Sequence, residues 1–150
     1  MVGGSLEAGE DHGVYAHDGA TVELEAVRLS GNEIGVRVLE SRASLRDIVV
    51  ESGRGPAVAA GQGATVVVHG GELEAGEYAA LEAFDGGHIT AAGCVCRTDD
   101  DPTLAYDGGT VELLAWIVAL GAAGGRAAQT DFYVPSVPLR CGMGGVSWAV

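Results

Sequence analysis

The tetrapeptide Gly63-Ala64-Thr65-Val66 decides the fold of this chain, because close copies of it recur along the sequence. Successive copies start 44, 23 and 22 residues apart, and the other three are Gly19-Ala20-Thr21-Val22, Gly86-Gly87-His88-Ile89 and Gly108-Gly109-Thr110-Val111. The interval of 44 residues spans two periods, and the intermediate copy is Arg42-Ala43-Ser44-Leu45. A period of about 22 residues therefore runs through most of the chain, which indicates a repeat architecture.

Apolar residues recur at fixed positions within this period. One column holds Leu24, Leu45, Val68, Ala91 and Leu113, and another, five residues later, holds Leu29, Val50, Leu73, Cys96 and Val118. A third column holds Val14, Val36, Val58, Leu81 and Leu104, and two residues after it come Ala16, Val38, Ala60, Ala83 and Tyr106. Around these columns, apolar and polar residues alternate with the two-residue period of a strand. We therefore expect an all-β solenoid in which the strands of successive turns stack in parallel.

The corners of such a solenoid need residues that adopt a positive φ. The dipeptides Asp18-Gly19, Gln62-Gly63, Asp85-Gly86 and Asp107-Gly108 supply them at the expected interval. A β-sandwich is the main alternative, since it also contains short alternating strands. A sandwich has no reason to keep its apolar columns in register at 22 residues, whereas a coil of fixed circumference does.

The pattern Gly-Ala-Thr-Val-x-Leu-x-x-Val-x-Leu-x-Gly, followed by Gly-Val-x-Val, resembles the right-handed, single-stranded parallel β-helix of the pectate-lyase-like superfamily. The resemblance covers about residues 2–120 and implies about five to six coils of about 22 residues. The superfamily includes polysaccharide lyases, hydrolases, epimerases, phage tailspikes and catalytically silent modules, so the resemblance is specific for fold only.

The repeat predicts one domain with two parts, a parallel β-helix over residues 1–128 and an irregular segment over residues 129–150. Pro135 and Pro138 lie in the second part, and proline stops strand addition because it lacks a ladder donor. This segment is expected to form a C-terminal cap or an association tail. Extrapolation of the Leu24 column by 22 residues places Val2 in the first strand, so the first coil also requires a cover.

The composition excludes several classes of function. The 150 residues contain 21 acidic and only 8 basic side chains, and the net charge of −13 argues against nucleic acid as a partner. The longest apolar run, about residues 113–125, is too short to span a bilayer, so no membrane partner is expected. The first 20 residues contain neither a basic residue nor a continuous apolar block, which favours a cytoplasmic location.

The outward positions of the first strand in each repeat carry the candidate site. Glu25, Arg46 and His69 would stack on neighbouring coils, with Asp47 at the adjacent corner. The resemblance implies that this strand and corner form a substrate groove, although a solvated ladder of opposite charges explains the same residues. His88, in a row with Thr21, Ser44, Thr65 and Thr110, could face the same groove.

The remaining ligand candidates are aromatic residues of the C-terminal segment. Tyr133 and Trp148 suit a ligand pocket, a cap or an interface equally well. No metal site and no cofactor are expected. Cys94 and Cys96 fit free buried thiols rather than a disulfide or a zinc site, and Asp99–Asp101 fit a solvated loop rather than a calcium site.

No catalytic residue of the superfamily enzymes can be transferred to this chain, and the corners are too short to wall a cleft. The sequence therefore favours a binding or assembly module that engages a protein partner or a second copy of itself. The alternative is a small enzyme, of the lyase, isomerase or cyclase type, that acts on a carbohydrate or small biosynthetic intermediate. Arg46 and His69 would then handle protons or stabilise an anion, and the ligand would be a saccharide or another small molecule.

Overall fold

The structure, a computed structural model, describes the backbone of residues 1–7, 11–114, 117–121, 130–133 and 139–141 and the side chains of residues 1–7 and 11–114. The described residues form strands and turns and contain no helix. The strands are β1 (Val2–Glu7), β2 (His12–Ala16), β3 (Thr21–Asn32), β4 (Ile34–Leu39), β5 (Arg42–Ser52), β6 (Val58–Gly61), β7 (Thr65–Ala75), β8 (Leu81–Ala83), β9 (His88–Ala92), β10 (Val95–Thr98), β11 (Thr103–Ala105), β12 (Thr110–Leu114), β13 (Ile117–Gly121), β14 (Thr130–Tyr133) and β15 (Leu139–Cys141).

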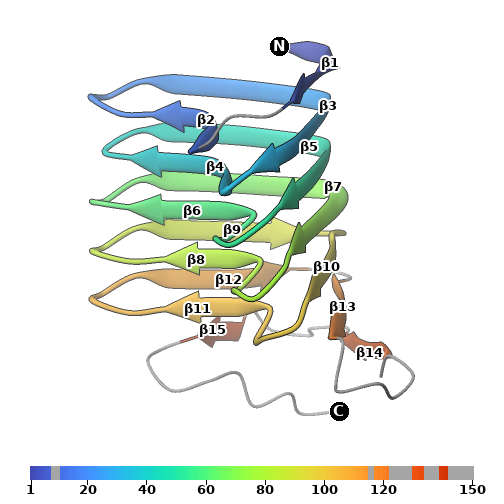
Figure 1. The fold of residues 1–150 in the computed structure, drawn as a ribbon. Coiled ribbons are helices and arrows are strands. Elements are labelled where there is room, and N and C mark those ends of the chain that lie inside the picture. Colours follow the sequence, from blue (N-terminus) through green and yellow to red (C-terminus); the bar gives the residue numbers. More distant parts are fainter. Residues whose placement is uncertain (8–10, 115–116, 122–129, 134–138, 142–150) are drawn as a thin grey trace.

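The chain winds into a parallel β-solenoid of about five turns, as the sequence predicted (Figure 1). Each turn adds one strand to a five-stranded sheet, in the order β11-β8-β6-β4-β2, and one or two strands to a larger sheet that begins β1-β3-β5-β7. Strands one turn apart pair in parallel with a register that follows the repeat. Leu24 pairs with Leu45, Leu45 with Val68, and Val68 with Ala91, so the first apolar column is confirmed.

Each turn has three outward surfaces, because the long strands β3, β5 and β7 bend in the middle. We call the surface of residues 21–25, 42–46 and 65–69 with β9 and β12 face 1, the surface of residues 27–32, 48–52 and 71–75 with β10 and β13 face 2, and the surface of the five-stranded sheet face 3. The bend between faces 1 and 2 has a positive φ in four successive turns, at Ala26, Asp47, Gly70 and Gly93.

Glycine is required beside this bend in the third turn. Gly71 has a φ of +95°, and a Cβ built there would lie 2.1 Å from the carbonyl oxygen of Ile48 in the turn before. Backbone thus approaches backbone more closely than a side chain would allow.

The corner between face 3 and face 1 confirms the turn residues expected from the sequence. Asp18, Gln62, Asp85 and Asp107 all have φ between 48° and 57°, and the glycine after each also has a positive φ. Glu40 adopts the same conformation, with φ of 50°, although Ser41 rather than glycine follows it. The corner therefore repeats in all five turns, because its backbone geometry, and not one residue type, is what the coil requires.

The apolar columns fill the interior of the coil. Most of their described members are almost fully buried. The largest buried side chains of the core include Leu29, Leu45, Ile48, Leu73, Leu81, Ile89 and Leu113. Full burial of a side chain of this size stabilises a fold by about 1.5–3 kcal/mol. Like residues stack over like residues in successive turns, so the core has the same width along its length.

Two predicted columns are wrong in their last members. Thr103, and not Leu104, pairs with Leu81, and Ala105, and not Tyr106, pairs with Ala83. The step from Leu81 is 22 residues, whereas the step from Val58 to Leu81 is 23, so extrapolation at constant length overshoots by one. The observed register keeps the phenol of Tyr106 outside the core, where it finds a hydrogen-bond acceptor.

At both ends of the repeat, the register also differs by one residue from the predicted one. Cys96 pairs with Ala119 rather than with Val118, and Val2 pairs with Glu25, one residue beyond Leu24. Val2 does begin the first strand, but it continues the outward row rather than the apolar column. Turns of 21 to 23 residues explain these displacements, because small changes in corner length shift the register while the stacking is kept.

Parallel pairing gives way to antiparallel pairing near the end of the chain. β14 pairs with β13, and β15 pairs with β12, both antiparallel. The cap predicted for residues 129–150 lies largely outside the described residues, and Tyr133 and Trp148 are beyond the described side chains. The proposed division at residue 128 stays a prediction.

Candidate functional site

Face 1 contains the row predicted as a candidate site. Glu25 pairs with Arg46, and Arg46 pairs with His69, so the three side chains lie on successive turns as expected. Asp47 lies at the corner, where its Oδ1 would be 2.2 Å from a Cβ built on Gly70. All four residues are exposed. Within the described part of the chain, no side-chain hydrogen bond or ion pair joins them.

Two open hollows border this face. The smaller, of about 180 Å³, is lined by Glu23, Glu25, Ser44 and Arg46 together with Met1 and Val2. The larger, of about 500 Å³, follows the corner between faces 3 and 1 and is lined mainly by polar residues, including Glu40, Arg42 and Gln62. His69 lines neither of them. The predicted acid, guanidinium and imidazole are therefore stacked in register but do not enclose a reaction volume.

His88 is placed in a hydrogen-bonded cluster on the same face. It pairs with Thr65 and Thr110, but the other members of its row are Arg42 and Thr21, so the assignment of Ser44 to this row was wrong. Its Nδ1 lies 2.5 Å from Thr110 Oγ1, and its Nε2 lies 3.1 Å from Thr90 Oγ1 and 3.7 Å from Glu112 Oε2. The imidazole is thus held by three neighbours on β9 and β12.

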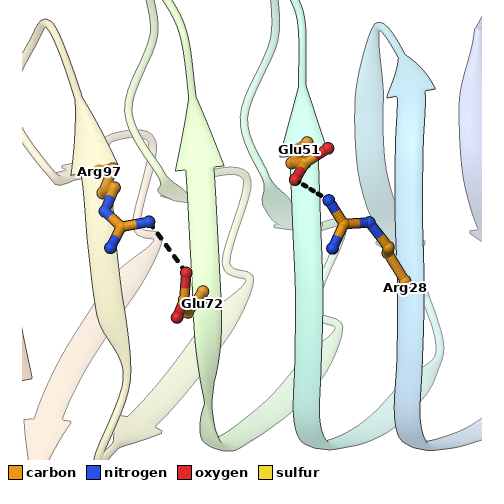
Figure 2. Close-up of polar contacts among 4 residues, drawn as sticks. All are labelled: Arg28, Glu51, Glu72 and Arg97. Atoms are coloured by element: carbon orange, nitrogen blue, oxygen red, sulfur yellow. Dashed lines mark hydrogen bonds and ion pairs between the residues drawn. The ribbon is translucent and has the colours of Figure 1, made fainter.

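The charged residues of face 2 form exposed ion pairs. Arg28 of β3 forms an ion pair with Glu51 of β5, and Arg97 of β10 forms one with Glu72 of β7, with 2.9 Å between nitrogen and oxygen (Figure 2). Both pairs are diagonal between neighbouring strands, and all four side chains are 41–55% exposed. Exposed pairs of this kind contribute about 0–1 kcal/mol.

Face 3 contains a row that connects all five strands of the smaller sheet. The paired residues, from β2 to β11, are Tyr15, Arg37, Ala59, Glu82 and Leu104. The two ends of the row are the most exposed members, with Tyr15 at 48% and Leu104 at 37%, whereas Ala59 at the centre is 1% exposed. Ala59 points away from the core, since its neighbours Val58 and Ala60 belong to the core cluster and it does not. The side chains of the surrounding turns therefore cover it.

Glu82 is the most deeply buried charged residue of this face, at 7% exposed. Its Oε1 accepts hydrogen bonds from the hydroxyl groups of Tyr78, at 2.8 Å, and Tyr106, at 3.0 Å. Burial and the neighbouring carboxylate raise the pKa of Tyr78 to about 12, and the same two causes raise the pKa of Tyr106. Both phenols stay protonated at neutral pH and hold the carboxylate in place.

Arg37 lies next to Ala59 on the side opposite Glu82, and its guanidinium lies near an aromatic ring. Its guanidinium carbon is 5.9 Å from the ring centre of Phe84, and its Nη1 is 3.4 Å from His12 Nε2. The Phe84 ring stacks on Tyr106 with 5.8 Å between centres. Gly61 makes room for this arrangement, because a Cβ there would lie 2.4 Å from the Phe84 ring and 3.0 Å from Leu39.

This group on face 3 was not predicted from the sequence, although the positions of its row follow a sequence pattern. Tyr15, Arg37, Ala59 and Glu82 each lie between two apolar columns, so reading the position between those columns would have found the row. The contacts of Phe84, Tyr78 and Tyr106 carry no such signal. They depend on which turn each corner side chain reaches, which only the stacked structure shows.

Cys94 and Cys96 are buried, free thiols, as predicted. Burial raises the pKa of Cys94 to about 11 and raises that of Cys96 further above its ordinary value. Such thiols are poor nucleophiles at neutral pH. Among the described side chains, no three His, Cys, Asp or Glu residues are arranged to hold a metal ion, and Asp99–Asp101 are exposed.

No helix among the described residues is long and apolar enough to cross a membrane. Comparisons with protein-family models, with curated proteins and with solved structures found no match to this chain.

Proposed function

We propose that this protein is a binding module whose interaction surface is face 3. The observation that carries the proposal is the row from Tyr15 to Leu104. These two exposed side chains flank the half-buried Arg37, the buried Ala59 and the buried Glu82, whose carboxylate accepts two tyrosine hydrogen bonds. Interfaces are enriched in Tyr, Phe and Arg, and their most important residues have positions fixed by neighbours before the partner arrives. Face 3 has both features.

Faces 1 and 2 fit this role less well. The charged residues of face 2 form exposed diagonal pairs, and the Glu25–Arg46–His69 row of face 1 is exposed and without mutual bonds. The enzyme alternative needs Arg46 and His69 to work on one substrate in a site that excludes water. The hollow beside Arg46 is small and open, and His69 does not line it, so the geometry favours binding over catalysis.

We also retain the pectate-lyase-like superfamily as the proposed family of the solenoid. Its support is the repeated Gly-Ala-Thr-Val phrase, the three outward faces per turn and the corners with positive φ. This assignment concerns the fold and adds no catalytic residue to the chain.

A photo-crosslinking experiment in the producing cell tests the binding function. A crosslinking amino acid at Leu104, on face 3, is compared with one at Val67, on face 1, because both side chains are apolar and exposed, at 37% and 45%. We expect defined protein adducts from position 104 that Arg37→Glu abolishes, and none from position 67. Equal adducts from both positions, or none from position 104, would contradict the proposal.

A further inference from the structure

Face 3 is nearly symmetric in chemistry about Ala59. Arg37 lies one strand to one side of Ala59 and Glu82 one strand to the other, so opposite charges are at equal distances from the centre. Tyr15 and Leu104 lie two strands away on either side, so both ends of the row are exposed and apolar. Stacked strands are about 4.8 Å apart, which makes these offsets equal.

The neighbouring row repeats this arrangement around Gly61. Leu39 and the Phe84 ring approach the Cα of Gly61 from the turns on either side of it. The centre of each row is thus a small residue, and its flanks are larger side chains, of opposite charge around Ala59 and apolar around Gly61.

Resting on the proposed role of face 3 as an interaction surface, we propose that its partner is a second copy of this chain, packed face to face about a two-fold axis. The axis lies in the plane of the interface, runs along the strands and passes over Ala59. This rotation reverses the order of the turns, so Arg37 of each copy faces Glu82 of the other, and Tyr15 faces Leu104. In a two-fold interface every such contact occurs twice.

The carboxylate of Glu82 is prepared for this contact. Both tyrosine hydroxyl groups bond to its Oε1, and among the described residues its Oε2 has no partner. Glu82 is 7% exposed, so the surface that it offers to a donor from outside is small. The guanidinium of Arg37 can supply that donor from the opposite copy. Among the described residues its one side-chain hydrogen bond joins Nη1 to His12, its Nε is buried without a partner, and its central carbon lies 5.9 Å from the centre of the Phe84 ring. A fixed carboxylate that faces a fixed guanidinium forms a specific charged contact.

The size of the face sets the expected strength. Five strands at about 4.8 Å and three to six residues in each strand at about 3.3 Å give a face of about 24 by 10–20 Å. Such an area falls in the range of small, transient interfaces. We therefore expect a weak dimer, seen at micromolar concentration and above, in about 0.15 M salt, which screens the repulsion between two chains of net charge −13.

Charge-swap variants test the geometry through sedimentation or light scattering over a concentration series. Arg37→Glu places two carboxylates opposite each other, and Glu82→Arg places two guanidinium groups opposite each other. We expect each variant alone to associate at least tenfold more weakly than the wild type. An equimolar mixture of the two should recover the dimer, because every position 37 then faces an opposite charge at position 82. Val67→Arg, on face 1, is the matched control and should associate like the wild type.

A second pair covers the case in which Glu82→Arg prevents folding, as circular dichroism would show. Tyr15→Arg and Leu104→Glu change exposed side chains, should each weaken association, and should form a dimer when mixed. A wild-type chain that stays monomeric to millimolar concentration, or mixtures that recover no dimer, would overturn the two-fold pairing. If position 104 then crosslinks to a different protein, the binding function stands without the dimer, and if it crosslinks to nothing, both proposals are wrong.

Discussion

Faces 1 and 3 are built by the same repeat, yet their charged residues behave differently. On face 1, Glu25, Arg46 and His69 are aligned on successive turns and remain exposed, whereas on face 3, Arg37 and Glu82 are anchored by aromatic neighbours. The difference follows from what lies between the charges. Ala59 separates Arg37 from Glu82 on face 3, whereas Glu25, Arg46 and His69 follow one another on consecutive turns of face 1. Alignment alone therefore does not make a site.

The largest expected effect comes from filling the space on face 3. Gly61→Val would force the Phe84 ring and Leu39 away from the sheet, since even the first carbon of a side chain lies too close to both. We expect a loss of about 1–3 kcal/mol in the free energy of unfolding, the usual cost of overpacking. Urea denaturation measures it.

Gly53→Val is the matched control for this substitution. A Cβ at Gly53 meets only the carbonyl oxygen of Asn32, at 3.8 Å, which is an ordinary contact. Its unfolding free energy should stay within about 0.5 kcal/mol of the wild type. Equal losses at both positions would mean that the space around Gly61 is not special.

A smaller loss of stability is expected when one glutamate is removed from each of the two faces. Glu82→Ala takes away the acceptor shared by Tyr78 and Tyr106, and we expect a loss of about 1 kcal/mol, because the phenols are only partly buried and can turn to water. Glu25→Ala, on face 1, should change stability by less than about 0.5 kcal/mol. Thermal unfolding followed by circular dichroism compares the two, and a larger loss for Glu25→Ala would reverse the contrast between the faces.

The last effect, which is absent at neutral pH, is a dependence of stability on alkaline pH. The pKa of Tyr78 is raised from 10.0 to about 12 in the folded protein, so the folded state holds this proton more tightly than the unfolded state. The resulting stabilisation is complete below pH 10 and is lost as pH rises through 12. The free energy of unfolding, measured in urea from pH 9 to 12, should fall less steeply with pH for Tyr78→Phe than for the wild type. Identical slopes would show that the pKa of Tyr78 is not raised in the folded protein.

Much of the fold could be predicted because a solenoid has one dominant constraint, the constant circumference of its turns. The column from Leu24 to Leu113 and the corners at Asp18, Gln62, Asp85 and Asp107 follow directly from it. The predictions for Leu104 and Val118 were wrong because corners differ in length by a residue, and a shift of one residue exchanges inside for outside in a strand.

The candidate site could be predicted from the sequence less completely than the fold. Sequence reasoning identified the aligned row of Glu25, Arg46 and His69, because alignment depends on register alone. It could not identify the group around Glu82, whose contacts join Tyr78, Phe84 and Tyr106 from corners of different turns. These contacts depend on the direction and reach of each side chain.

The sequence by itself determined the all-β solenoid, its period, its core columns and its turn residues, because each follows from local alternation repeated at a constant interval. The tertiary structure decided which outward face carries an organised surface. Tyr15, Arg37, Ala59, Glu82 and Leu104 are far apart in the sequence and acquire their order only when five turns are stacked. Only then are opposite charges placed at equal distances from a small central residue.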